Sequence, residues 1–208
     1  MKGLTKQEGN ILVSIARRAI SQYVNSARRI PAPEVSQKLR EKRGVFVTLS
    51  RVESGRKSLR GCIGYPLPTM PLIEATISAA ISAAVEDPRF PSVDPSELDR
   101  IQVEVSVLTP PETISEGERR KLPGLVRVGV DGLIAERGFN KGLLLPQVPV
   151  EWGWNAEEFL GQTCMKAGLP VTSWLEKDVW IQRFQAQIFE ETEPGGQVEE
   201  RPLGAEGC

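Results

Sequence analysis

The residues best suited to chemistry lie together in the segment 59–64, LRGCIG, which combines a guanidinium, a thiol and two glycines. On a strand, alternate side chains share a face, so Arg60 and Cys62 are expected to be neighbours roughly 7 Å apart. A guanidinium at that distance favours the thiolate, the nucleophilic form of cysteine. Gly64 would leave open space beside the sulfur, and Gly61 would let a facing element approach closely. This spacing predicts a small site for an anion or an electrophile, with Cys62 as candidate catalytic residue and Arg60 as anion anchor.

A second interpretation of Cys62 involves no chemistry. A single cysteine in a strand commonly packs as a small hydrophobic side chain, and glycines in strands commonly mark bulges. Residue types alone do not separate a reactive thiol from a packed one, so both interpretations stay open.

Three further polar residues are candidate binding residues. Asp87 and Arg89 lie at a helix end, where they either line a site beside Cys62 or only stop the helix and pair with each other. Glu104 projects from the polar side of a predicted strand. If that strand neighbours the segment 59–64, Glu104 is placed to face Arg60 as its partner or as a base; otherwise it belongs to a solvated strand face.

The composition excludes several classes of site and environment. The chain has no histidine, the usual acid–base group near neutral pH and the commonest metal ligand. Its cysteines, Cys62, Cys164 and Cys208, form no CxxC pair, so no metal site is predicted. An odd number of widely spaced cysteines suits a reducing compartment, and the longest apolar stretch, 72–85, is too short for a bilayer. A cytoplasmic protein without a membrane partner is expected.

Charge is unevenly distributed along the chain. Residues 1–60 contain 14 Lys/Arg and four Asp/Glu, a net charge of +10, whereas the whole chain carries −1. Such segregation indicates either a basic face for an anionic partner, such as RNA, or internal neutralisation by the acidic remainder. The basic segment contains only two aromatic residues, so RNA contact would be driven mainly by phosphates and sensitive to salt.

The elements that must position these residues follow from periodicity and capping signals. Helices are predicted at 6–26, 34–43, 71–86 and 155–167. Strands are predicted at 45–49, 59–64, 101–108, 142–146 and 179–190, the last with a bulge between Ile181 and Phe184. A hairpin is predicted from 125–130 and 133–135, with Asp131-Gly132 as its turn.

Strands that cluster in pairs rather than alternating with helices predict an α+β fold, in which antiparallel or mixed sheets are flanked by helices. Residues 191–208 are rich in glycine, proline and glutamate, which favours a disordered acidic tail.

Several motifs in the same order resemble the AMMECR domain family. They are LRGCIG at 59–64, AAVEDPRF at 83–90, VSVL at 105–108, GLLLPQV at 142–148 and CMKAGL at 164–169. The resemblance covers residues 5–190, and the tail has no counterpart in it.

The resemblance implies one AMMECR domain over residues 1–190, built from two α+β subdomains with the LRGCIG motif near a groove between them. It implies no established reaction and specifies no cofactor, so whether the protein is an enzyme stays open. Gln147 and Glu151 lie where the resemblance continues and become candidate binding residues. Association of family members with Memo-like and radical-SAM proteins implies those partners and suggests a role in nucleotide or RNA modification. The alternative is a non-catalytic module that binds a protein or RNA.

Overall fold

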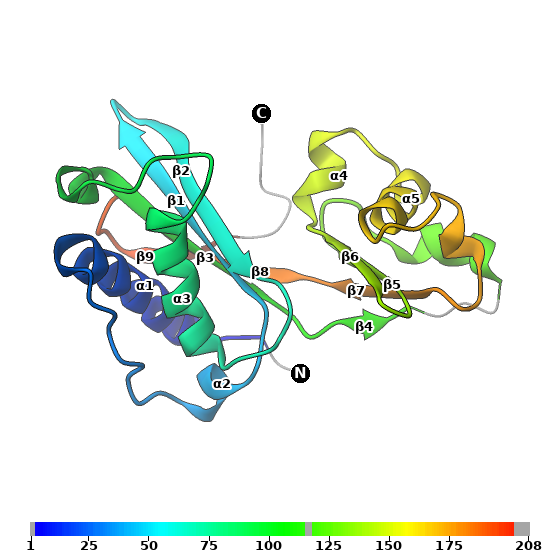
Figure 1. Cartoon of the computed structure of the whole chain (residues 1–208), viewed down its shortest axis with the longest axis horizontal. Coiled ribbons are helices and arrows are strands. Elements are labelled where there is room, and N and C mark those ends of the chain that lie inside the picture. Colours follow the sequence, from blue (N-terminus) through cyan, green and yellow to red (C-terminus); the bar gives the residue numbers. More distant parts are fainter. Residues whose placement is uncertain (1–2, 115–117, 202–208) are drawn as a thin grey trace. The chain divides into compact units, whose positions relative to one another are not determined.

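The computed structural model describes residues 3–114 and 118–201 (Figure 1). The chain forms two compact units. The described residues of unit 1 are 3–108 and 187–201, and those of unit 2 are 109–114 and 118–186. Unit 1 therefore contains both the segment 59–64 and the C-terminal part of the described chain.

Unit 1 contains three α-helices and a five-stranded sheet. The helices are α1 (Lys6–Ser26), α2 (Gln37–Arg40) and α3 (Leu72–Val85), and a 3-10 helix spans Pro95–Arg100. The strands are β1 (Val45–Glu53), β2 (Arg56–Tyr65), β3 (Ile101–Leu108), β8 (Ala186–Glu191) and β9 (Val198–Arg201). They lie in the order β2-β1-β3-β8-β9, and β1 pairs antiparallel with both β2 and β3.

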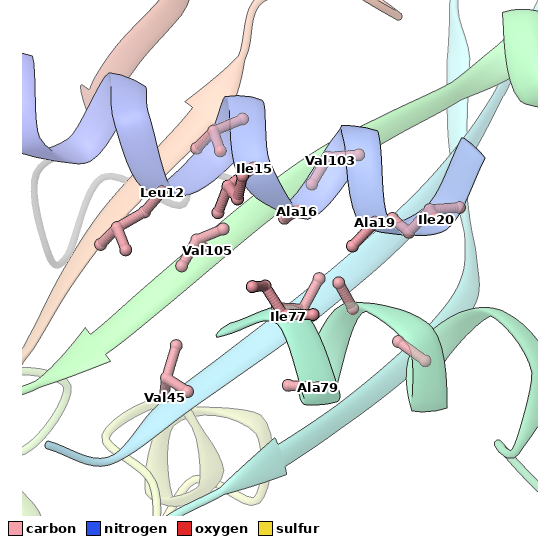
Figure 2. Close-up of a cluster of buried hydrophobic side chains, with 14 of the residues drawn as sticks. Leu12, Ile15, Ala16, Ala19, Ile20, Val45, Ile77, Ala79, Val103 and Val105 are labelled. Atoms are coloured by element: carbon pink, nitrogen blue, oxygen red, sulfur yellow. The ribbon is translucent and has the colours of Figure 1, made fainter. Parts of the chain in front are cut away.

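The core of unit 1 lies between α1, α3 and one face of this sheet. Figure 2 shows side chains of both helices packed toward Val45, Val103 and Val105 of the strands. Alternation directs Val45 and Val47 of β1 and Val103, Val105 and Val107 of β3 to the helices, and Thr48, Glu104 and Ser106 to the other face. We call the face that carries Thr48, Cys62, Glu104 and Ser106 the polar face.

Unit 2 is built around a four-stranded sheet in the order β4-β7-β5-β6. Its strands are β4 (Glu112–Thr113), β5 (Gly132–Arg137), β6 (Asn140–Leu144) and β7 (Trp180–Phe184). Its helices are α4 (Gln147–Glu151) and α5 (Ala156–Lys166), with 3-10 helices at Arg119–Leu125 and Ser173–Leu175. Phe159, Leu160 and Cys164 of α5 are fully buried in the core of this unit.

The α+β prediction is confirmed, and the strongest local signals form the expected elements. Thr5 begins α1 and Asn155 begins α5 with capping boxes, because each side chain accepts a backbone N–H that the helix leaves unpaired. The strand 101–108 has the predicted bounds. The predicted basic helix 34–43 shortens to α2. No helix of the described residues is long and apolar enough to cross a membrane.

Two predicted strand arrangements are wrong. The hairpin of unit 2 joins β5 to β6 and does not turn at Asp131-Gly132. The fully buried Asp131 carboxylate instead accepts the backbone N–H of Arg127 at 2.9 Å, which closes a turn before β5. The predicted strand 179–190 divides at Gln185, because β7 joins the sheet of unit 2 and β8 that of unit 1.

The prediction of a disordered tail is also wrong for residues 191–201. Strand β9 pairs antiparallel with β8, from Ile188 opposite Arg201 to Glu191 opposite Val198. The carboxylate of Glu191 is buried and bonded to Arg17 of α1 and to the backbone N–H of Val103. Composition alone does not reveal these long-range bonds. Residues 202–208, including Cys208, lie outside the described residues.

Candidate functional site

The segment LRGCIG forms the second half of β2, and a bulge interrupts its alternation. Leu49 lies opposite Gly61 and Ser50 lies opposite Leu59, so Arg60 is the extra residue in β2. The prediction that Arg60 and Cys62 share a strand face is therefore wrong. Gly61 faces α3, Cys62 lies on the polar face, and the bulge directs Arg60 elsewhere.

Arg60 is a buried structural cation. Its guanidinium donates from Nε and Nη2 to the two carboxylate oxygens of Glu97, both at 2.9 Å, and from Nη1 to the Pro91 carbonyl at 2.9 Å. Nη2 also reaches the Ser92 carbonyl at 3.3 Å. These bonds from Arg60 are the main reason why the pKa of Glu97 falls to about 2. Arg60 joins β2 to the segment after α3, and its donors are engaged there rather than at Cys62.

Cys62 is partly exposed on the polar face, in a row that crosses three strands. Thr48 lies opposite Cys62 on one side and opposite Glu104 on the other. The Thr48 hydroxyl donates to the Cys62 sulfur at 3.3 Å. Burial raises the pKa of the Cys62 thiol, and the bond from Thr48 and the charge of Arg89 offset this only in part. The thiol is therefore mostly protonated near neutral pH, contrary to the expected thiolate.

Asp87 and Arg89 hold the backbone of Cys62 at the sheet edge. The buried Asp87 carboxylate accepts the Cys62 N–H at 2.8 Å, and Arg89 Nη2 donates to the Cys62 carbonyl at 3.3 Å. Arg89 also forms a two-pronged ion pair with Asp87, with Nε–Oδ1 at 3.0 Å and Nη2–Oδ2 at 2.7 Å. The bonds from Arg89 hold the pKa of Asp87 well below its usual range. The guanidinium beside the thiol is therefore that of Arg89.

Glu104 lies on the polar face, but its partner is not Arg60. Its Oε2 accepts from Arg201 Nη2 of β9 at 2.9 Å, and its Oε1 accepts from the Ser106 hydroxyl at 3.2 Å. The strand β1 separates β3 from β2, so the row places the Thr48 side chain between Glu104 and Cys62. Thr48 was not among the predicted site residues, although strand alternation over 45–49 was the signal for it. Nothing in the composition of 191–208 indicated Arg201.

The two glycines of the segment have packing roles. A Cβ on Gly64 would lie 2.3 Å from the Phe46 ring, so Gly64 does not leave the expected open space beside the sulfur. A Cβ on Gly61 would lie 2.1 Å from the Ala83 carbonyl oxygen, in the backbone of α3. Gly61 thus permits the close approach between β2 and α3.

Replacing Gly61 with Ala should destabilise the protein by about 1–3 kcal/mol, because the rigid α3 backbone must move to admit the methyl group. Urea unfolding followed by circular dichroism measures this effect. Gly124→Ala is the matched control, since a Cβ at Gly124 meets no atom within 4 Å, and its effect should stay within about 0.5 kcal/mol. Equal stabilities of the two variants would contradict the packing role of Gly61.

The remaining candidate binding residues, Gln147 and Glu151, are not part of the row Thr48, Cys62 and Glu104. Gln147 and Glu151 are exposed residues at the two ends of α4 in unit 2. Cys164 is fully buried, and burial raises its pKa to about 11. Among the described residues, no group of three histidine, cysteine, aspartate or glutamate side chains is placed to hold a metal ion.

Comparison with known proteins relates almost the whole chain to one family. The AMMECR1 family model matches residues 13–189. A protein of Thermococcus gammatolerans is 60% identical over 94% of this chain and 96% of its own length, and Protein TK0174 of Thermococcus kodakarensis is 58% identical with the same coverage. A crystal structure described as uncharacterized protein PH0010, from Pyrococcus horikoshii, matches with a TM-score of 0.79 and 55% identity, covering 94% of this chain and 97% of that one.

Proposed function

Since this chain belongs to the AMMECR1 family, we propose that the polar face of its five-stranded sheet binds a small ligand at the row Thr48, Cys62 and Glu104. Cys62 is the group that a reactive ligand would meet. The names of these relatives state no activity, so the proposal rests on the geometry of the row.

One observation carries this proposal: both backbone groups of a partly exposed cysteine are bound by side chains at the sheet edge. A buried carboxylate binds its N–H and a guanidinium binds its carbonyl. A thiol that only fills space in a strand needs no such support, whereas binding and catalytic groups gain from being held in one geometry. The support therefore favours a functional Cys62 over a packed one.

The protonated state of the thiol defines its role in the proposal. Near neutral pH the raised pKa leaves Cys62 as a neutral donor and acceptor for a ligand. It becomes a nucleophile only when its proton is removed. The proposal is therefore a binding site first, and catalysis by Cys62 stays a prediction. The link to nucleotide or RNA modification and the Memo-like and radical-SAM partners are also predictions, and they rest on the resemblance. The groove expected between the two subdomains also rests on the resemblance.

The alternative, a non-catalytic module for a protein or RNA, has weaker support from the charges. Six of the 14 cationic residues in 1–60 form ion pairs with carboxylates: Arg17, Lys38, Arg43, Arg51, Lys57 and Arg60. Only three of these cations, Arg17, Lys57 and Arg60, pair with carboxylates outside 1–60, since the other three pair with glutamates that the net charge of +10 already counts. Internal neutralisation by the acidic remainder thus accounts for part of the net positive charge.

Thiol labelling with iodoacetamide tests the binding site, in a Cys208→Ser background. Cys62 should react in the folded protein at least about tenfold faster than Cys164, because a fully buried thiol reacts only when the structure opens. Its rate should rise with a pH midpoint above that of the unfolded chain, as its raised pKa requires. Mass spectrometry of the labelled peptides separates the two cysteines.

Cys164 serves as the internal control for local opening. Labelling of Cys62 at the rate of Cys164, or only at the rate of global unfolding, would show a sealed sulfur and overturn the proposal.

A further inference from the structure

The ion pairs around Cys62 are asymmetric in exposure. In the pair of Arg89 and Asp87, the side chains are 52% and 2% exposed, respectively. In the pair of Arg201 and Glu104, the corresponding values are 26% and 19%. In both pairs the cation is the more exposed partner. The two carboxylates balance the two guanidinium groups in number, but solvent and solutes mainly meet the guanidinium of Arg89.

Arg89 is also held in place before any ligand arrives. Asp87 fixes it through Nε and Nη2, and its guanidinium lies 5.5 Å from the centre of the Phe90 ring. The guanidinium lies close enough to Cys62 that the two groups shift each other's pKa. Three of the five N–H donors of Arg89 are used by Asp87 and the Cys62 carbonyl, which leaves the two on Nη1 to meet a carboxylate or phosphate oxygen. Because little side-chain entropy remains to be lost, this arrangement suits the capture of an anion.

We infer that Arg89 is the anion anchor of the Cys62 site, and that the ligand of this site carries a carboxylate or phosphate group placed beside the sulfur. This inference rests on the proposed function, because it assumes that Cys62 meets a ligand. Arg89 takes the role expected for Arg60, whose donors are engaged with Glu97 and with backbone carbonyls. Asp87 then acts as a positioning residue that orients Arg89 and the Cys62 backbone together.

Two alkylating reagents that differ in charge test this inference in the Cys208→Ser protein. Iodoacetate carries a carboxylate and iodoacetamide does not, but both alkylate sulfur in the same way. The sulfur forms a bond to the CH₂ carbon, the C–I bond breaks, iodide leaves, and the thiol proton passes to the buffer. The measured quantity is the ratio of the iodoacetate rate to the iodoacetamide rate at Cys62, at one pH, for folded and urea-unfolded protein.

An anchored anion should raise this ratio in the folded protein at least about threefold over the unfolded chain, an effect of the size of an exposed ion pair. Arg89→Gln should return the ratio to the unfolded value, and Arg89→Lys, which keeps the charge without the fork, should retain part of the increase. Inorganic phosphate should slow the labelling of Cys62 by iodoacetate in the Cys208→Ser protein and have no such effect on its Arg89→Gln variant.

Arg56→Gln is the matched control, because it removes one exposed positive charge from the same strand without contact to Asp87 or Cys62. It should leave the ratio unchanged. Two results would overturn the anion anchor, provided that iodoacetamide still labels Cys62. One is a rate ratio that is equal in folded and unfolded protein. The other is a ratio that Arg89→Gln and Arg56→Gln lower equally. Absence of iodoacetamide labelling in the folded protein would instead overturn the binding site itself.

Discussion

Replacing Arg60 with Met should destabilise the protein by about 3–5 kcal/mol and leave the rate of Cys62 labelling by iodoacetamide unchanged in the folded state. The first effect follows because Glu97 and the Pro91 carbonyl lose their partner, and an uncompensated buried charge is costly. The second follows because the bulge turns Arg60 away from Cys62, and its guanidinium is bonded to Glu97 and the Pro91 carbonyl. Urea unfolding measures the first effect, and peptide mass spectrometry measures the second.

The double variant Arg60→Met/Glu97→Gln provides the sharper control. It removes both charges, while the amide can still accept the Asp94 N–H that Glu97 now accepts at 2.9 Å. Part of the lost stability should return, because no unpaired charge stays buried. Arg100→Met, which breaks an ion pair exposed on both sides, should cost no more than about 1 kcal/mol. If Arg60→Met costs no more than Arg100→Met, the structural role of Arg60 is wrong.

The ion pair of Arg60 and Glu97 also sets part of the dependence of stability on pH. The pKa of Glu97 is about 2 in the folded protein, against an ordinary value of 4.5. A carboxyl whose pKa is depressed by folding stabilises the protein fully above its unfolded pKa and loses that contribution as the pH falls through the folded value. The stability difference between the wild-type protein and Arg60→Met should therefore shrink between pH 4.5 and pH 2.

Replacing Glu191 with Gln should also cost about 3–5 kcal/mol, although the change is isosteric. The buried carboxylate accepts from Arg17 Nη2 at 2.5 Å, from the Val103 N–H at 2.9 Å and from the Gly195 N–H at 3.3 Å. Loss of its charge leaves the Arg17 guanidinium without its counter-charge. An amide also turns one acceptor oxygen into a donor that meets other donors. Urea unfolding measures the cost, and hydrogen exchange should show loss of protection in β9.

The neighbouring residue provides the control for this prediction. Glu190 pairs with Lys57 at 3.2 Å and, at the longer distance of 3.8 Å, with Arg201 of β9. All three side chains are partly exposed, so Glu190→Gln should cost less than about 1 kcal/mol. Similar costs for Glu190→Gln and Glu191→Gln would mean that the buried pair of Arg17 and Glu191 does not secure the C-terminal strands.

The fold could be predicted where local signals decide it. The capping boxes at Thr5 and Asn155 and the alternation over 101–108 depend on nearby residues, and the structure follows them. The division at Gln185 and the strand β9 depend on partners distant in the sequence. The Gln185 N–H donates to the Thr109 hydroxyl, and Glu191 bonds to Arg17 of α1. Composition indicated disorder for 191–201 because it contains no information about these contacts.

The candidate site could be predicted in part for the same reason. Cys62, Asp87 and Arg89 were identified from their residue types, and the structure brings them together. The role of Arg60 could not be derived, because the bulge arises from the pairing of β2 with β1, and one extra residue changes which face every later side chain occupies. Arg201 entered the site from a segment whose sequence carried no strand signal.

The path of the chain through the two units has a consequence for the order of folding. Residues 109–186 of unit 2 are inserted in the sequence between two parts of unit 1. The strands β8 and β9 therefore complete the sheet of unit 1 only after this insertion has been synthesised. During synthesis, β3 is made long before its neighbour β8, so its edge stays bare and open to wrong pairing for that interval. Unit 2 can therefore fold before the sheet of unit 1 is complete, and Arg201 is the last residue to join the surface around Cys62. A nascent chain released before residue 201 would lack this guanidinium beside Glu104.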